Sequence, residues 1–222
     1  MTHEYDFGGC NLGDGGVPAA EGGALLGWRS PALAPISLRL ITPRLLIEGL
    51  RYLGLAWEPE PFEEVGSDDQ RPGMYTWVDG IDLSRDAVDR AVLYTGIGMN
   101  ARYRVVKESS WKTGDHAHGR MLARRNACAL LGSVTGSGTP DLSFLHELSE
   151  RHLLKEEGIA IVHDWVERVS PLRQAEEFSI RLSIHLGDTV SPVNSQFAGA
   201  WNTQRPADWA AFAVAAWMAL EA

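Results

Sequence analysis

The 222-residue chain has little cysteine, no long hydrophobic run and no basic, apolar start. Only Cys10 and Cys128 are present, without metal-ligand spacing, which argues against a disulfide framework and favours a reducing compartment. No stretch of 18 apolar residues occurs, so we expect no contact with a membrane through a spanning helix. The first residues lack the pattern of a secretory signal. Together these absences predict a cytoplasmic protein.

Net positive charge is also missing, because 20 Lys and Arg stand against 29 Asp and Glu, a balance of −9. Proteins that bind nucleic acid usually carry a basic surface, so the overall charge counts against a nucleic-acid enzyme. The charge is unevenly distributed, however. Residues 101–125 contain seven basic and two acidic side chains, a local charge of +5. This segment can still present a positive face to a polyanion.

The N-terminal part of the chain is short of regular patterns. Residues 1–35 are rich in Gly, Ala and Pro and have little hydrophobic periodicity, which predicts irregular structure. Thr42 followed by Pro43 is typical of a helix start, and apolar residues at helical spacing continue over about 43–54. We therefore expect one helix in an otherwise irregular extension.

An acidic, proline-containing stretch at 58–73 is the best candidate for a boundary. It divides the chain into an N-terminal extension over 1–65 and a domain over 70–200. Residues 206–222 have apolar side chains at roughly helical intervals and predict a terminal helix. This helix would pack on the domain or on a second copy of the chain, which would make the protein a homodimer.

The domain begins with two strand-like segments, 74–79 (MYTWVD) and 91–95 (AVLYT), which we expect to form an antiparallel hairpin. Asn100 can cap a short basic helix that begins at Ala101. Further helices are predicted at 117–131, 142–154 and 171–186, a plain loop after residue 131, and a third strand at 158–166. This order predicts an α+β fold with a small three-stranded mixed or antiparallel sheet flanked by helices.

Two tyrosines occupy corresponding places on the hairpin. Gly73 precedes Tyr75 closely on the first strand, and Gly96 follows Tyr94 on the second. Because side chains alternate along a strand, the two tyrosines can share one face of the sheet. A cross-strand aromatic pair that merely stabilises the sheet has the same pattern.

The hairpin motifs resemble those of the GIY-YIG nuclease family. GMY at 73–75 stands for the first motif and YTG at 94–96 for the second, with Met74 and Thr95 in place of the central isoleucines. The family places an arginine ten positions after the second tyrosine, which is Arg104 in this chain.

The resemblance extends over residues 72–197 and implies a GIY-YIG-like fold. Family members carry a glutamate on a later helix and an asparagine close to a proline. The matching residues are Glu176 in EEFSIRL and Asn194 in SPVNSQ, with Glu177 as the alternative to Glu176.

The resemblance implies divalent-metal-dependent hydrolysis of DNA phosphodiester bonds. Glu176 would bind Mg²⁺ or Mn²⁺, because hard cations prefer carboxylate oxygen. Arg104 would hold the phosphate oxygens with its planar fork of donors. Tyr75 would accept the proton of the attacking water, as a relay or through a lowered pKa, because free tyrosine, with a pKa of about 10, is a poor base.

The remaining residues would support these three. Tyr94 would orient the water or the phosphate, and Asn194 would tie the site together by hydrogen bonds. Some family members have a histidine after the arginine, so His118 is a candidate, although a surface histidine in a turn fits equally well. Contacts with flanking phosphates are predicted for Lys107 and Arg120, and Arg102 is the alternative to Arg104 if the register is shifted by two residues.

A second class of function fits the same pattern. Each residue taken singly has an ordinary interpretation: Arg104 as a solvated charge, Glu176 as a complement to a helix dipole. The alternative hypothesis is a non-catalytic module that keeps the fold and binds nucleic acid or another protein.

Overall fold

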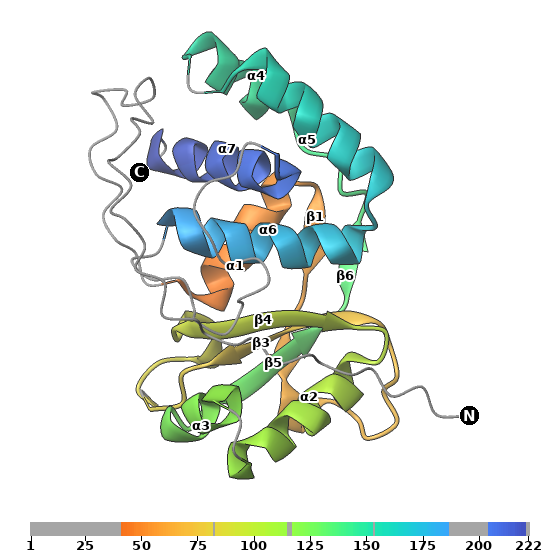
Figure 1. Cartoon of the computed structure of the whole chain (residues 1–222), viewed down its shortest axis with the longest axis vertical. Helices are drawn as coiled ribbons and strands as arrows, with labels where there is room; N and C mark the ends of the chain where they lie inside the picture. The colour runs from red at the N-terminus through yellow and green to blue at the C-terminus, as the bar shows by residue number, and fades with distance from the viewer. Residues whose placement is uncertain (1–40, 82, 115–116, 153, 187–203, 221–222) are drawn as a thin grey trace, which may run out of the picture. The chain divides into compact units, whose positions relative to one another are not determined.

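The computed structural model describes residues 41–81, 83–114, 117–152, 154–186 and 204–220. Over these residues the protein is α+β, with seven α-helices, a four-stranded antiparallel sheet and a separate two-stranded pair (Figure 1). None of the helices in the described part combines the length and the apolar character needed to cross a lipid bilayer.

The larger sheet has the strand order β2-β5-β3-β4, and every neighbouring pair is antiparallel. The strands are β2 (Glu60–Pro61), β3 (Gly73–Val78), β4 (Val92–Gly98) and β5 (Cys128–Gly132). The predicted hairpin is confirmed as β3 and β4, with β3 inside the sheet and β4 at its edge. Of the three expected strands only the two of the hairpin are confirmed. The segment predicted as a connection at 58–73 supplies β2, and the second half of the helix predicted over 117–131 supplies β5. Where the domain begins and ends stays a prediction.

The helix predicted over 117–131 is wrong in its second half. Helix α3 (Ala117–Arg124) stops before Asn126, which has a φ of 47°, a left-handed conformation that interrupts a helix. The chain then enters β5 and pairs with the central strand. The loop expected after it contains β6 (Val134–Gly136), which pairs with β1 (Leu55–Trp57).

The strand predicted at 158–166 is also wrong, because these residues lie in helix α5 (Glu156–Arg168). Its buried residues, Gly158, Val162 and Trp165, recur at the spacing of one helical face. Two glutamates in the first turn complement the helix dipole. The β-branched composition of this segment reflects a buried helix face, not a strand.

The other predicted helices are confirmed. Thr42 caps α1 (Pro43–Tyr52) by accepting a hydrogen bond from the N–H of Leu45 at 3.3 Å. Asn100 caps α2 (Ala101–Ser110) by accepting a hydrogen bond from the N–H of Tyr103 at 2.8 Å. The confirmed helices also include α2 (Ala101–Ser110), α4 (Leu142–Glu150), α6 (Pro171–Leu186) and α7 (Pro206–Leu220).

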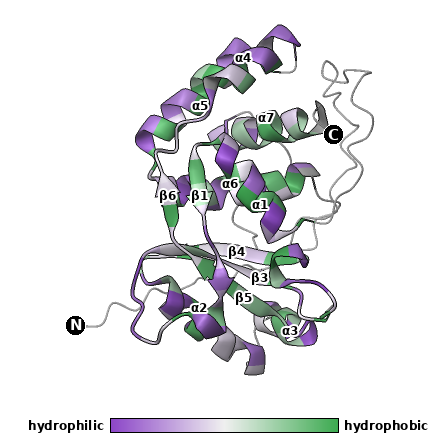
Figure 2. Cartoon of the chain, turned by 180° about the vertical axis from the view of Figure 1, so that it is seen from behind, coloured by the Kyte–Doolittle hydropathy of each residue, from purple (hydrophilic) through white to green (hydrophobic). Residues whose placement is uncertain are grey.

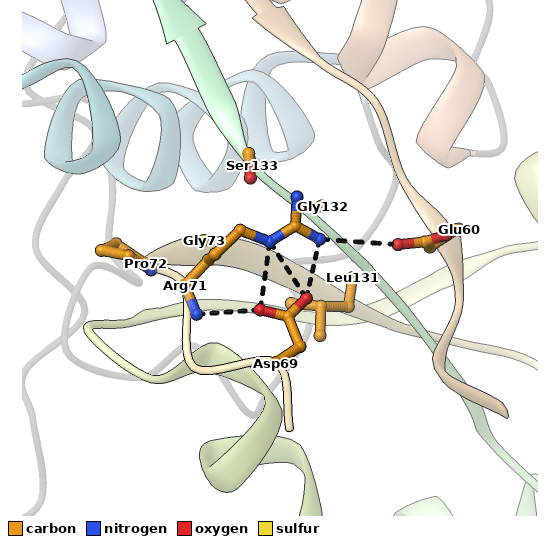
Figure 3. A pocket seen from close by; sticks show the side chains of 8 residues that line it. All are labelled: Glu60, Asp69, Arg71, Pro72, Gly73, Leu131, Gly132 and Ser133. Atoms are coloured by element: carbon orange, nitrogen blue, oxygen red, sulfur yellow. Dashed lines mark hydrogen bonds and ion pairs between the residues drawn. The ribbon is translucent and has the colours of Figure 1, made fainter. Parts of the chain in front are cut away.

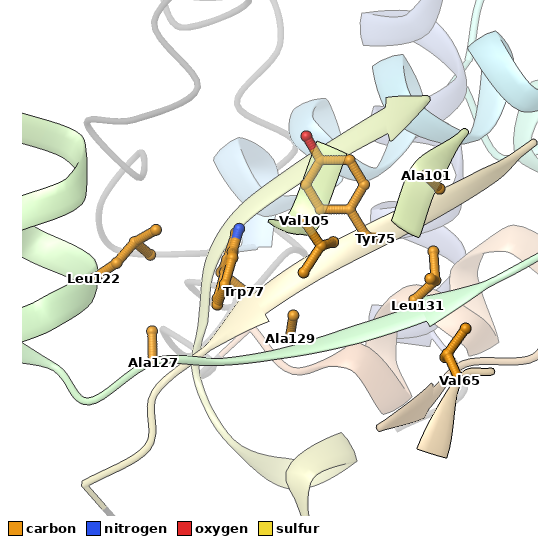
Figure 4. Packing of buried hydrophobic residues seen from close by; sticks show 9 residues of the cluster. All are labelled: Val65, Tyr75, Trp77, Ala101, Val105, Leu122, Ala127, Ala129 and Leu131. Carbon is orange, nitrogen blue, oxygen red and sulfur yellow. The ribbon is translucent and has the colours of Figure 1, made fainter. Parts of the chain in front are cut away.

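Helices cover both faces of the four-stranded sheet. Helices α2 and α3 lie on one face, and α6 contacts β3 and β4 from the other side (Figure 1). The core under α2 and α3 contains Val65, Tyr75, Trp77, Ala101, Val105, Leu122, Ala127, Ala129 and Leu131 (Figure 4). The fold therefore places β3, β4 and the start of α2 around one aromatic-rich region.

Helix α7 is mostly hydrophobic in Figure 2 and packs against α4, α5 and α6 of the same chain. Its predicted docking on the rest of the chain is thus observed, and a homodimer stays a prediction. A buried ion pair between Arg181 of α6 and Asp208 joins the two helices. Both of these charged side chains are at most 1% exposed.

Candidate active site

The two tyrosines of the hairpin meet on the sheet face that α2 covers. Their ring centroids are 6.0 Å apart, with the ring planes tilted by 46° to each other. The register pairs Tyr75 with Gly96, so the ring of Tyr75 lies where a side chain would otherwise stand. Tyr75 is fully buried, whereas Tyr94 is partly exposed. The shared face predicted from strand alternation is confirmed.

Arg104 reaches the tyrosine pair because α2 starts directly after β4 and turns back over it. Gly98 makes room, since a β-carbon there would lie 2.8 Å from the Cγ of Arg104. Its Nη2 lies 3.8 Å from Oε1 of Glu108, the oxygen that accepts from the Tyr75 hydroxyl, and the Arg104 side chain stays 41% exposed. Arg102 lies elsewhere, with its guanidinium carbon 5.4 Å from the ring centroid of Phe62. Of the two candidate arginines, the structure brings Arg104 to the tyrosines.

Sequence reasoning missed Glu108, the central acidic group of this cluster. Its carboxylate is buried and accepts hydrogen bonds from the Tyr75 hydroxyl at 2.6 Å and from the Trp77 indole N–H at 2.9 Å. Figure 4 shows the two donor atoms on the same side of β3. In the sequence Glu108 stands four residues after Arg104, which is also the pattern of an exposed helical ion pair. One signal in the sequence was available: Tyr75 and Trp77 lie on the same face of one strand, so their two donors can share a single buried acceptor.

Burial controls the protonation of this cluster. It raises the pKa of Tyr75 far above its usual value, and the nearby Glu108 charge raises it further. Burial, followed by the charge of Glu108, raises the pKa of Tyr94 to about 12. The pKa of Glu108 is also raised by burial, against the opposing effect of its two hydrogen-bond donors. Neither tyrosine has the lowered pKa of a direct base, so only the relay expected for Tyr75 agrees with these surroundings.

Glu176 approaches the same region from α6. Its carboxylate accepts from Arg173 at 2.9 Å, and the backbone of Ile97, on the edge strand β4, acts to lower its pKa. Burial raises the pKa of Glu176, and its charge contributes to the raised pKa of Tyr94. Glu177 is more exposed and bonds the Nε of Arg173 at 2.8 Å. Glu176 is therefore the glutamate that contacts the tyrosine-bearing strand.

The donor set at Glu176 suits a hard cation of the magnesium type. The described residues contain no group of three or more His, Cys, Asp or Glu side chains placed to hold a metal. Mg²⁺ in nucleotide-processing sites commonly uses one or two carboxylates and takes its other ligands from water and phosphate. Oε2 of Glu176 accepts from Arg173, and a carboxylate has about four acceptor positions in all, so positions for a cation remain. A single-carboxylate Mg²⁺ or Mn²⁺ site fits these residues.

The other predicted residues fall into three groups. His118 lies beside the site, its ring centroid 4.8 Å from that of Tyr94 and 5.6 Å from that of Trp111. Lys107 of α2 and Arg120 of α3 are exposed. Asn194 lies outside the described residues, so its predicted role stays a prediction.

A pocket near the start of β3 has a different lining (Figure 3). Arg71 crosses it and binds Asp69 through a 2.7 Å ion pair, with Glu60 at 3.9 Å. An adjoining cavity of about 370 Å³ shares Arg71 and Glu60. The tyrosine cluster does not line either of these pockets.

Comparison of the chain with protein-family models, with curated proteins and with solved structures finds no match.

Proposed function

We propose that this chain is a divalent-metal-dependent endonuclease that hydrolyses DNA phosphodiester bonds with a GIY-YIG-type site. One observation carries the proposal: Tyr75, Tyr94, Arg104 and Glu176, predicted from sequence order alone, converge on strands β3 and β4 from three separate parts of the chain. In the family pattern the arginine stands on the first helix and the glutamate on a later one. Here Arg104 approaches the two tyrosines from α2, and Glu176 approaches them from α6. Strand pairing and the start of α2 directly after β4 account for the two tyrosines and Arg104. The approach of Glu176 from the distant helix α6 is the part that an accidental motif does not explain.

The charges of the cluster suit a phosphodiester. The partly exposed guanidinium of Arg104 is held from below by Tyr75 and by Glu108, whose Oε1 lies 3.8 Å from its Nη2. A fork fixed in this way can donate two parallel hydrogen bonds to phosphate oxygens. A cation bound at Glu176 would neutralise phosphate charge and assist the leaving oxygen. Lys107 and Arg120 extend positive charge to flanking phosphates.

The exposure of the two tyrosines changes the roles expected for them. Because Tyr94 is the more exposed of the pair, it is the tyrosine that contacts the attacking water. Tyr75 is buried behind it and passes the proton inward. His118, packed on the ring of Tyr94, keeps that ring in place.

The test is nicking of supercoiled plasmid DNA by the full chain with Mg²⁺ or Mn²⁺, with EDTA as the metal-free arm. We expect nicked product with the cations and none with EDTA. A labelled RNA of the same sequence, run in parallel, tests the preference for DNA. Failure to cut any substrate, with retained binding in a gel-shift assay, would replace the enzyme by the non-catalytic binding module.

A further inference from the structure

Glu108 has surroundings that structural packing alone does not require. It is 0% exposed, on the inner face of α2, in a core otherwise built from apolar residues. A buried carboxylate is costly unless hydrogen bonds compensate for lost water, and an apolar residue of similar size would fill the same space. Here the hydroxyl of Tyr75 and the indole of Trp77 supply the compensation, and Arg104 lies above them.

The hydrogen bonds around Tyr75 have a single consistent direction. Its hydroxyl carries one hydrogen, which it donates to Oε1 of Glu108 at 2.6 Å. Its oxygen can then only accept, and Tyr94, whose ring centroid lies 6.0 Å away, is the tyrosine on its more exposed side. A proton path can therefore run from the partly exposed Tyr94 through Tyr75 to the buried Glu108.

We propose that Glu108 is the terminal proton acceptor of this proton path. It is a positioning residue that lets two neutral tyrosines activate the attacking water. The proposal rests on the proposed nuclease function. It explains why a carboxylate, and not an apolar side chain, occupies the core beneath the site.

The proposed step moves one proton from the attacking water to Glu108. The water gives a proton to the Tyr94 oxygen, Tyr94 gives its hydroxyl proton to Tyr75, and Tyr75 gives its own to Oε1 of Glu108. The water oxygen forms a bond to phosphorus, and the bond from phosphorus to the leaving sugar oxygen breaks. That oxygen keeps the electron pair and takes a proton from solvent. Glu108, now neutral, returns its proton along the same path.

The groups that face Glu108 tune it for this task. Tyr75 and Trp77 donate to it from β3, and the positive charges of Arg104 and Lys107 act on it from its own helix. These four groups favour the carboxylate, but burial outweighs them and raises its pKa. A carboxylate with a raised pKa accepts a proton more readily near neutral pH.

The test compares the pH dependence of plasmid nicking in the wild type, Glu108→Gln and Glu108→Asp. Glutamine has the same shape and still accepts a hydrogen bond from Tyr75, but it cannot take the proton. We expect Glu108→Gln to nick at least about 100-fold more slowly. Its rate should also no longer fall toward acid pH, which is the acid limb of the rate profile in the wild type. Glu108→Asp keeps the acid limb and recovers part of the rate.

A second variant covers the case in which Glu108→Gln does not fold. Trp77→Phe removes one donor to the Glu108 carboxylate, so the acid limb should move to higher pH. A purely structural Glu108 predicts no such movement. An active wild type whose acid limb stays in place in Trp77→Phe, or survives in a folded Glu108→Gln, overturns the proposal alone. A wild type that cuts no substrate overturns the nuclease function and this proposal together.

Discussion

The ring of Tyr75 lies directly over Gly96, its partner on the neighbouring strand, and no other residue fits there. A β-carbon at position 96 would stand 2.7 Å from the hydroxyl oxygen of Tyr75 and 3.0 Å from Cε1 of Tyr94. The glycine of the YTG motif is therefore required by the two tyrosines. Motif glycine and motif tyrosines form one packing unit.

Gly96→Ala should displace both tyrosine rings. We expect a loss of about 1–3 kcal/mol in the free energy of unfolding, typical of an overpacked core, and a large fall in nicking. Gly114→Ala is the matched control, because among the described residues its β-carbon would meet only the carbonyl oxygen of Trp111, at 3.6 Å. Urea titration and plasmid nicking measure the two effects. Equal behaviour of the two variants would contradict the close packing.

Arg104→Ala should lower the nicking rate by at least about 100-fold, because it removes the donors that hold the phosphate. Arg102→Ala is the control on the same helix. It loses the contact with Phe62 and a charge that acts on Asp69, both away from the tyrosines, so its rate should stay close to that of the wild type. Single-turnover nicking of both variants measures the difference. A larger loss in Arg102→Ala would mean that the shifted arginine register is the right one.

Replacing Glu176 and Glu177 in turn tests the metal ligand. Both glutamates bond Arg173, so each substitution to glutamine disturbs the same arginine. Glu176→Gln should abolish Mg²⁺-dependent nicking, because only Glu176 also reaches the edge strand through Ile97. Glu177→Gln should keep most of the activity. The measurement is the nicking rate across a Mg²⁺ titration, and the reversed pattern would assign the metal to Glu177.

Local signals in the sequence were enough for the hairpin and for most helices. The caps Thr42 and Asn100 determine where α1 and α2 begin, and both act through residues only three positions away. The alternation of side chains on β3 and β4 was also sufficient to place the two tyrosines on one face. These features depend on neighbours in the chain or on one hairpin.

The predictions from sequence were wrong where contacts between residues far apart in the chain determine the structure. Strand β5 has a composition that also suits a helix, and its pairing with β3 settles the matter. Helix α5 looks like a strand because its buried face contains Val162 and other apolar residues. Glu108 was missed for the same reason, because its role depends on donors 31 and 33 residues away. Sequence order identified the outer residues of the site, but not the residue that lies beneath them.

The buried pair Arg181–Asp208 should contribute strongly to the attachment of α7. Asp208→Asn leaves the guanidinium of Arg181 buried without its charged partner, which typically costs about 3–5 kcal/mol. Asp164→Asn is the control, because Asp164 pairs with Arg168 on the surface of α5 with both side chains more than half exposed. Its effect should stay below about 0.5 kcal/mol. Chemical denaturation measures both, and a similar small change in each would show that the buried pair is dispensable.

The raised pKa of Glu108 also has a consequence for stability that is independent of catalysis. When a carboxyl group has a higher pKa in the folded than in the unfolded protein, the folded state binds more protons between the two values. Stability then falls as the pH rises from the ordinary glutamate pKa, about 4.3, to the folded value. Glu108→Gln lacks this titration. The free energy of unfolding of the wild type minus that of the variant should therefore decrease with rising pH across this window and stay constant above it. A difference that increases with pH would mean that the hydrogen bonds from Tyr75 and Trp77 outweigh burial and lower the pKa of Glu108.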